Sequence, residues 1–252
     1  MTTLLFTHES AADHDTGPGH PERSDRIRAV KAALETSSFQ ELKRRESPLA
    51  DIDQISRVHR KDYVTGLLDS IPGEGYARID PDTVLSPASG DAALRSVGAV
   101  IAAVDAVTSG EATNAFCAVR PPGHHAEPGR GMGFCLFNNV AIAAAHAREA
   151  CHVDRVAIVD FDVHHGNGTQ AAFWTDPSVM FASSHEYPFY PGTGAEDERG
   201  QGNIYNVPLN AMSGSSEFRK GMERTVLPAL EAFDPGLLII SAGFDAHARD
   251  PL

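Results

Sequence analysis

The residues most able to do chemistry lie in one stretch, RVAIVDFDVHHGNG, at 155–168. Its first part, 156–159, is a continuous β-prone apolar run, which is typical of a strand buried in a parallel sheet. Residues two apart in an extended segment point the same way, so Asp162 and His164 can direct a carboxylate oxygen and an imidazole nitrogen to one point. Asp160 lies one step behind them. These ligand types suit zinc or another first-row divalent ion, and they predict a metal site at the carboxyl end of this strand.

A strand followed by a polar loop is the simpler interpretation of the same stretch. It would be preferred for a lone Asp-x-His pair, because such short patterns are common. Here two acids and two histidines, the second being His165, lie between an apolar run and a glycine-rich turn. That density of ligand-type residues favours the metal site.

A third candidate ligand follows another predicted strand. The apolar run 237–240 leads through SAGFDAH to Asp245. The carboxyl ends of neighbouring parallel strands lie together at one edge of a sheet. We therefore expect Asp162, His164 and Asp245 to form a three-ligand site, which leaves a coordination position open for water and substrate.

Two adjacent histidines, His124 and His125, follow the predicted strand 114–119 in a loop rich in proline and glycine. One imidazole of such a pair can take a proton from metal-bound water, and the other, when charged, can stabilise negative charge on a substrate oxygen. Acidic or amide partners on the far ring nitrogens would fix the tautomer and basicity of each ring. The pair therefore predicts acid–base chemistry.

Strand and helix patterns alternate along the chain, which predicts an α/β fold with a doubly wound, mostly parallel sheet and helices on both faces. We expect a single domain over residues 1–252. The predicted strands are 3–7, 114–119, 156–159, 178–183 and 237–240. The predicted helices are 21–34, 52–58, 63–68, 91–108, 139–150, 167–174 and 215–233.

The composition argues against several classes of protein. The 252 residues are 42% apolar and 22% charged, and the formal net charge is −13. An acidic chain is poorly suited to nucleic acid or an anionic membrane, but is compatible with cationic substrates. The three cysteines form no close pair, the N-terminus lacks a signal-peptide pattern, and no apolar run reaches membrane-spanning length. We therefore expect a cytoplasmic protein without nucleic-acid or membrane partners.

Four motifs occur in order along the chain. They are RPPGHHA at 120–126, GFCLFNN at 133–139, DFDVHHGNGTQ at 160–170 and SAGFDAH at 241–247. With these motifs the sequence resembles the histone deacetylase superfamily, which includes bacterial deacetylase-like amidohydrolases, acetylpolyamine amidohydrolases and acetoin-utilisation-type deacetylases. The resemblance runs from about Gly17 to the last residue. It implies an arginase/deacetylase-like fold and zinc-dependent removal of acetyl groups from acetyl-lysine-type amides.

The resemblance also implies roles for individual residues. His125 would be the general base and later the acid, and His124 its electrostatic partner, supported by Asp160. The residue that supports His125 would be Asn167, where class I-like members carry Asp, so the chain resembles the class II-like branch. The ligands of Zn²⁺, with Fe²⁺ or Co²⁺ as alternatives, would be Asp162, His164 and Asp245.

By the same resemblance, Phe134 and Tyr190 would form the walls of a narrow acyl-lysine channel, although many relatives have Phe at the second position. The backbone carbonyl of Gly133 would accept the substrate amide, and Arg26 would lie at the foot of the pocket, where acetate leaves. A structural K⁺ would be bound by Asp160, Asp162, His164, Ser183 and Ser184.

The sequence departs from the family pattern at its C-terminal end. Family members have a Gly-Gly-Tyr turn well after the last zinc ligand, and its Tyr hydroxyl binds the substrate carbonyl oxygen. This chain stops at Leu252 without such a motif. We therefore expect the C-terminal part of the family domain to be missing from it, and an extended protein to be the more active form.

Three functions are compatible with these residues. A deacetylase would act on acetyl-lysine-type amides. An acetylpolyamine or other small-amide deacylase would use the same chemistry, and the acidic residues of the predicted rim loop, Glu186, Glu196, Asp197 and Glu198, would suit a small cationic amide. A non-catalytic acyl-lysine or metal-binding homologue would bind without turnover. Each could form a homo-oligomer.

Overall fold

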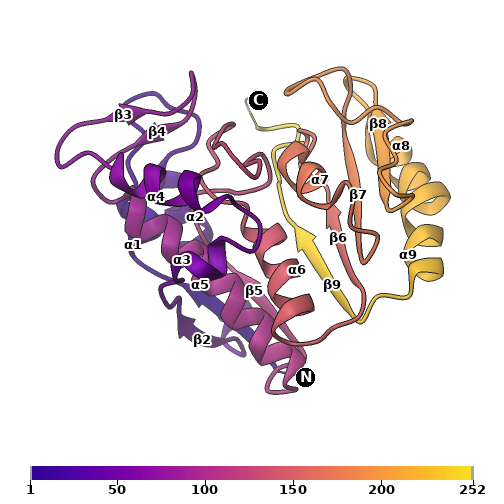
Figure 1. The fold of residues 1–252 in the computed structure, drawn as a ribbon, viewed down its shortest axis with the longest axis horizontal. Helices are drawn as coiled ribbons and strands as arrows, with labels where there is room; N and C mark the ends of the chain where they lie inside the picture. Colours follow the sequence, from indigo (N-terminus) through magenta and orange to yellow (C-terminus); the bar gives the residue numbers. More distant parts are fainter. Residues whose placement is uncertain (1, 251–252) are drawn as a thin grey trace. The chain divides into compact units, whose positions relative to one another are not determined.

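The structure is a computed structural model, and it describes residues 2–250. Contacts divide the chain into two compact units, residues 1–146 and 147–252. In each unit parallel strands alternate with helices (Figure 1). The expected α/β class, with mostly parallel sheets flanked by helices, is therefore confirmed. The described strands form one parallel sheet in each unit, rather than the single sheet that we expected.

The sheet of the first unit has three parallel strands with β1 in the centre. Its members are β1 (Thr3–Thr7), β2 (Lys43–Glu46) and β5 (Asn114–Cys117). Successive side chains of a strand point to opposite faces. Leu4 and Phe6 of β1 accordingly share a core with α5 (Ser89–Thr108), whereas Leu5 shares one with α2 (Ser24–Leu34). Helices therefore cover both faces of β1.

A further core of the first unit lies beneath the loops that follow β5. Its buried members include Val64, Leu85, Val97, Phe137 and Ile142. They join α5 to α3 (Ile52–Ile55), α4 (Lys61–Asp69), β4 (Val84–Leu85) and α6 (Asn139–Glu149). The remaining elements of this part of the chain are α1 (Ser10–Asp13), the 3₁₀ turn η1 (Ser37–Phe39) and β3 (Ala77–Arg78), which pairs with β4 in antiparallel fashion.

The sheet of the second unit is entirely parallel, in the order β8-β7-β6-β9. Its strands are β6 (Val156–Asp160), β7 (Val179–Glu186), β8 (Ile204–Leu209) and β9 (Leu237–Ser241). Every residue of β6 is buried, as its continuous apolar run predicted. Asp160, at the end of β6, pairs with Ser183 on one side and Ser241 on the other. The segments that follow β6 and β9 therefore start from the same level of the sheet.

The helices of the second unit are α7 (Asn167–Phe173), α8 (Ser215–Gly221) and α9 (Leu227–Phe233). We expected one helix over 215–233, but a π-helical turn at Met222–Val226 separates α8 from α9. Pro228, at the start of α9, has no backbone N–H to donate, which explains the break in the regular hydrogen-bond ladder. Among residues 2–250, no helix has the length and apolar character needed to cross a bilayer.

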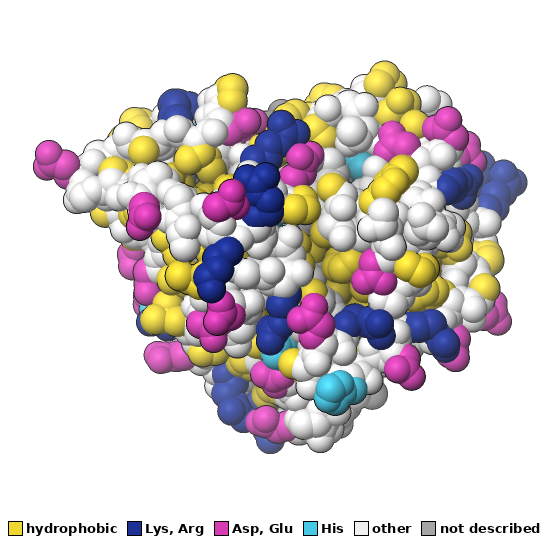
Figure 2. Space-filling view, viewed as in Figure 1, with side chains coloured by type: hydrophobic (Ala, Val, Ile, Leu, Met, Phe, Trp, Pro, Cys, Tyr) yellow, Lys and Arg dark blue, Asp and Glu magenta, His cyan; other side chains and the backbone are white. Residues whose placement is uncertain are grey.

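Charged side chains of both signs occur on the face drawn in Figure 2. Basic and acidic groups are interspersed over much of this face.

Candidate metal centre and catalytic residues

Three predicted metal ligands meet at the strand ends of the second unit. Asp162 and His164 follow β6, and Asp245 follows β9. The Oδ1 atom of Asp162 and the Oδ2 atom of Asp245 each lie 3.0 Å from Nδ1 of His164. One ligand atom from each residue lies within 4.8 Å of the other two. The convergence that the parallel-strand argument predicted is therefore present.

The carboxylates of this cluster also fold the backbone around it. Oδ1 of Asp162 accepts the N–H of His164 at 2.8 Å, and Oδ1 of Asp245 accepts the N–H of Val163 at 2.9 Å. The carboxylate of Asp160 accepts the N–H of Asp162 at 3.1 Å. Because these bonds hold both the loop and the carboxylates, the ligand atoms are preorganised.

The charges of the cluster favour a cation. Burial alone would lower the pKa of His164, but the hydrogen bonds and negative charges of Asp162 and Asp245 outweigh it and raise that pKa to about 9. Two carboxylates that face one ring nitrogen thus attract a proton unless another cation takes its place. Two carboxylate oxygens and one imidazole nitrogen form a donor set that suits Zn²⁺ or a similar divalent ion.

The tandem histidines lie in the first unit. His124 and His125 are both buried, and their ring centroids are 3.9 Å apart. Gly133 lies against the ring of His125: a Cβ atom at Gly133 would come within 2.4 Å of the ring Cδ2. Gly133 also has a φ of 56°, in the left-handed region that favours glycine. Both the close approach and the backbone conformation therefore require glycine at this position.

Phe134 continues this turn, also with a positive φ of 67°. Its backbone N–H donates to Oγ1 of Thr83 at 3.0 Å. Its ring meets the ring of His20 edge-on, at a centroid distance of 4.9 Å. Gly133 and Phe134, both predicted to line a channel, thus lie beside His125 in a firmly held turn.

A buried histidine that the sequence did not single out for this site, His59, holds the same loop. Its Nδ1 donates to the carbonyl of Glu127 at 3.0 Å, and its Nε2 accepts the N–H of Asn138 at 2.8 Å. The side-chain amide of Asn138 in turn donates to the carbonyl of Ala126 at 3.2 Å. His59 therefore ties together both ends of the loop that carries Gly133 and Phe134.

Two aromatic side chains cover His164 in the second unit. The ring of Phe189 is stacked on the imidazole at a centroid distance of 5.2 Å and an interplanar angle of 18°. The ring of Tyr190, the predicted channel wall, meets it edge-on at 6.0 Å. Tyr190 thus lies beside a predicted metal ligand. Phe189, the residue next to it in the chain, was not predicted as a site residue.

The other predicted site residues of the second unit lie near the ends of β6 and β7. Asp160 and Ser183 are register partners, and both are fully buried. The hydroxyl of Ser183 bonds to Nδ1 of His185 at 2.9 Å, whereas the buried hydroxyl of Ser184 has no hydrogen-bond partner within the described residues. Asn167 is buried in the first turn of α7. Backbone and hydroxyl oxygens are therefore concentrated at these two strand ends.

The profile of the histone deacetylase domain matches residues 20–252. The chain belongs to the histone deacetylase family. Relatives similar to it include the uncharacterised protein slr0245 of Synechocystis (42% identical over 100% of this chain and 84% of the relative) and the histone deacetylase-like amidohydrolase of Pseudomonas aeruginosa (41% over 93% and 63%). A probable deacetylase of Methanothermobacter thermautotrophicus is 42% identical over 99% of this chain and 76% of the relative.

The crystal structure of the HDA15 HD domain is similar in fold. It has a TM-score of 0.95 and 37% identity, and the match covers 100% of this chain and 75% of the other. The arginase/deacetylase-like fold that the motifs implied is therefore confirmed. Membership of the histone deacetylase family also supports a hydrolase that acts on amide bonds.

Arg26, assigned to the acetate pocket by the family pattern, belongs to a buried ion-pair network in the first unit. Its Nη1 lies 3.7 Å from Oε1 of Glu22, and its side chain is 51% exposed. Glu22 is fully buried and accepts a hydrogen bond from Nη2 of Arg120 at 2.8 Å. Arg26 is thus the solvent-exposed member of a network that begins at the RPPGHHA motif of the histone deacetylase family.

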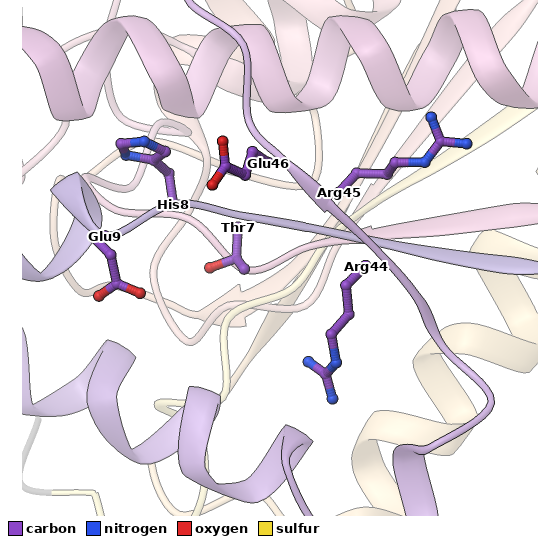
Figure 3. A pocket seen from close by; sticks show the side chains of 6 residues that line it. All are labelled: Thr7, His8, Glu9, Arg44, Arg45 and Glu46. Atoms are coloured by element: carbon purple, nitrogen blue, oxygen red, sulfur yellow. The ribbon is translucent and has the colours of Figure 1, made fainter.

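A small pocket of about 210 Å³ lies at the carboxyl ends of β1 and β2 (Figure 3). None of the predicted site residues lines it. Its two arginines already form ion pairs, Arg44 with Glu35 and Arg45 with Glu111. We therefore assign it no part in the histone deacetylase chemistry. The lining residues are Thr7, His8, Glu9, Arg44, Arg45 and Glu46.

Two buried histidines predict that mild acid destabilises the fold. Burial lowers the pKa of His14 and of His59 from 6.5 to about 4. Below pH 6.5 the unfolded chain therefore binds protons that the folded chain does not. The free energy of unfolding is therefore unaffected by these two histidines above that pH, and it decreases as the pH falls towards 4. Between pH 6.5 and about 5, we expect the free energy of unfolding to fall by about 3 kcal/mol from the two groups together.

Urea unfolding at several pH values measures this slope. The raised pKa of His164 in the metal-free chain does not disturb it, because that contribution is fully present below pH 6.5. A His59→Gln variant should show about half of the slope. A free energy of unfolding that stays constant from pH 6.5 to about 5 would contradict the prediction.

Proposed function

We propose that residues 1–252 form the catalytic domain of a zinc-dependent deacetylase, which hydrolyses acetyl-lysine-type amides to a free amine and acetate. The observation that carries the proposal is the convergence of Asp162, His164 and Asp245 at the ends of β6 and β9, with their ligand atoms within 4.8 Å of one another. Membership of the histone deacetylase family supports the same reaction.

Asp162, His164 and Asp245 would hold the metal ion. Zn²⁺ suits this donor set, and Fe²⁺ or Co²⁺ would also fit it. When bound, such an ion polarises the amide carbonyl and lowers the pKa of water from about 15.7 towards about 7. The roughly 18% exposure of the Asp162 side chain and 13% exposure of the His164 side chain fit a site that a substrate can reach.

His125 would act as the general base and then as the general acid. It takes a proton from the attacking water as the water oxygen bonds to the carbonyl carbon. It then gives that proton to the amine nitrogen as the carbon–nitrogen bond breaks. His124, in its charged form, would stabilise the negative oxygen, with Asp160 supporting His124 and Asn167 supporting His125.

The substrate would be a lysine-bearing or small cationic acetylated amide. Phe134 and Tyr190 would flank its aliphatic chain, the carbonyl of Gly133 would accept its amide N–H, and Arg26 would assist the release of acetate. The net charge of −13 supports a cationic substrate. A structural K⁺ is proposed at the ends of β6 and β7. It would be held by Asp160, Asp162, His164, Ser183 and Ser184.

The test is turnover of a fluorogenic acetyl-lysine amide, with metal removed by a chelator and then restored. We expect one divalent ion per chain, loss of turnover on chelation and recovery with Zn²⁺. Asp245→Asn keeps the oxygen that accepts the Val163 N–H but removes the charge, so it should lose both metal and activity. Asp197→Asn is the control, because Asp197 is exposed and has no bonding partner among the described residues.

Three results would contradict the proposal. One is a protein without stoichiometric metal, and another is an Asp245→Asn variant that remains fully active. The third is acetyl-lysine binding without turnover, which would indicate a non-catalytic binding module. Faster turnover of an acetylpolyamine than of acetyl-lysine amide would support the same reaction, with a polyamine as the substrate.

A further inference from the structure

The loop between β7 and β8 carries the aromatic residues that cover His164. Phe189 and Tyr190 lie near its start, and Pro188 and Pro191 flank them. Proline fixes its own φ, so the backbone around the two rings is stiff. Gly192 lies between the two rings and the later part of the loop, 193–198, and its backbone N–H donates to the carbonyl of Phe189 at 2.7 Å, so a hydrogen-bonded turn joins the two parts.

One carboxylate fastens that later part. Glu198 accepts the backbone N–H of Gly194 at 3.1 Å and that of Ala195 at 3.1 Å. It also accepts a hydrogen bond from Nε2 of Gln170, on helix α7, at 2.5 Å. Burial would raise the pKa of Glu198, but these three bonds outweigh it and lower that pKa. Glu198 is therefore a charged acceptor that links the loop to α7.

The contacts of Gln170 extend this link into the sheet. Its Oε1 accepts from Nε2 of His165 at 3.1 Å and from Nδ2 of Asn206, on β8, at 2.8 Å. With Nε2 of His165 as a donor, its Nδ1 accepts the hydroxyl of Thr193 at 2.7 Å. His165 thus holds the loop at a second point.

Close packing completes the attachment at Gly194. Its carbonyl accepts from Nε2 of His185 at 3.0 Å. A Cβ atom at Gly194 would lie 2.3 Å from that nitrogen and 2.7 Å from the ring of His165. The loop backbone therefore lies directly on two buried imidazoles, and Glu198 holds it there.

We propose that Glu198 is a positioning residue that fixes the aromatic wall of Phe189 and Tyr190, and so sets how tightly the aliphatic chain of the substrate is held. This inference rests on the proposed deacetylase function. It replaces the expectation that Glu198 belongs to an acidic rim facing a cationic substrate, because its carboxylate is bound to the loop itself. Its neighbours Glu196 and Asp197 are exposed and have no bonding partner among the described residues.

The metal-loaded protein provides the test, with acetyl-lysine amide as substrate. Glu198→Ala should raise KM roughly tenfold and change kcat less than about threefold, since the wall contributes equally to ground-state and transition-state binding. Glu198→Gln keeps one acceptor oxygen for the backbone N–H groups, so its KM should fall between those of wild type and Glu198→Ala. Glu196→Ala, which removes the same charge two residues away without touching the loop contacts, should raise KM less than Glu198→Ala does. Metal content should be equal in all four proteins.

Hydrogen exchange gives a second readout that does not depend on activity. Amides of 189–195 should exchange faster in Glu198→Ala than in wild type or Glu196→Ala. An unchanged KM or unchanged exchange in Glu198→Ala would overturn the inference, as would equal rises of KM in Glu196→Ala and Glu198→Ala, which would indicate recognition by charge alone. Wild-type protein without any turnover would overturn the proposed function, and the inference with it.

Discussion

Replacement of His125 by alanine is expected to lower kcat by about 10²–10⁴-fold, the usual contribution of a positioned general base. The metal content should stay at the wild-type level, because the ligand atoms of Asp162, His164 and Asp245 meet without any contribution from His125. Single-turnover kinetics on acetyl-lysine amide, with metal analysis of the same samples, measures both quantities.

The pH profile separates a catalytic loss from a structural one. In the wild type, the acidic limb of kcat/KM should report the deprotonation of the base, and in His125→Ala that limb should move or disappear. Because His125 is buried against Gly133, the variant leaves a cavity, so its melting temperature must be compared with that of His125→Asn. Loss of metal from either variant would identify His125 as a ligand. A loss of rate below tenfold would exclude it as the base.

The convergence of Asp162, His164 and Asp245 was predictable from sequence because its geometry is nearly local. Asp162 and His164 lie within five residues of a strand that its apolar run identifies, and Asp245 follows another strand of the same kind. The parallel arrangement of β6 and β9 then brings the three together without further information. His124 and His125 were singled out by their residue types in a loop after a strand, whereas Gly133 and Phe134 were singled out only by the resemblance to the histone deacetylase family; the roles of all four stay predictions.

Two strands of the parallel sheets were not predicted, and in both the apolar pattern is interrupted. β2 has the sequence KRRE, with all four residues exposed at one edge of the described sheet, where charges discourage pairing with another chain. β8 contains Asn206 and Pro208, two residue types that are typical of loops. Only the pairing with β1 and β7, which is a long-range property, makes these segments strands.

The supporting residues could not be predicted for a related reason. His59 bonds to backbone groups of Glu127 and Asn138, which are 68 and 79 residues away in the chain, and backbone partners leave no sequence motif. In the sequence, Glu198 does not differ from its acidic neighbours; only the folded loop brings its carboxylate into hydrogen-bond contact with Gly194 and Gln170. Residues that bear the chemistry are thus readable from type and spacing, whereas residues that orient them depend on tertiary contacts.

Gly243→Ala is expected to weaken metal binding by about 100-fold, the upper end of the range for loss of a group that supports a ligand. Gly243 has an ordinary φ, so alanine causes no backbone strain there. The conflict is steric. A Cβ atom at Gly243 would lie 2.1 Å from Oδ2 of Asp162, 2.5 Å from its Cγ and 2.6 Å from its Cβ.

Rotation of the Asp162 side chain cannot relieve this overlap. The Cβ of Asp162 is fixed to the backbone, and Oδ1 is held by the N–H of His164, so either the loop after β6 or the loop after β9, which carries Gly243 and Asp245, must move. Either movement shifts Asp245 relative to His164, whose Nδ1 lies 3.0 Å from Oδ2 of Asp245 in the wild type. Because both groups are proposed ligands, the loop shift should lower the affinity for the metal far more than it lowers the stability of the fold.

Competition with a chromophoric chelator measures the metal affinity, and thermal unfolding of the metal-free proteins measures the fold. The matched control is Gly214→Ala in the same unit, where a Cβ atom would meet its nearest neighbour, Glu217, at 3.8 Å, an ordinary contact distance. That variant should bind Zn²⁺ like the wild type. Equal affinities in Gly243→Ala and Gly214→Ala would contradict the proposed three-ligand site, since displaced carboxylates cannot leave the affinity of their own site unchanged.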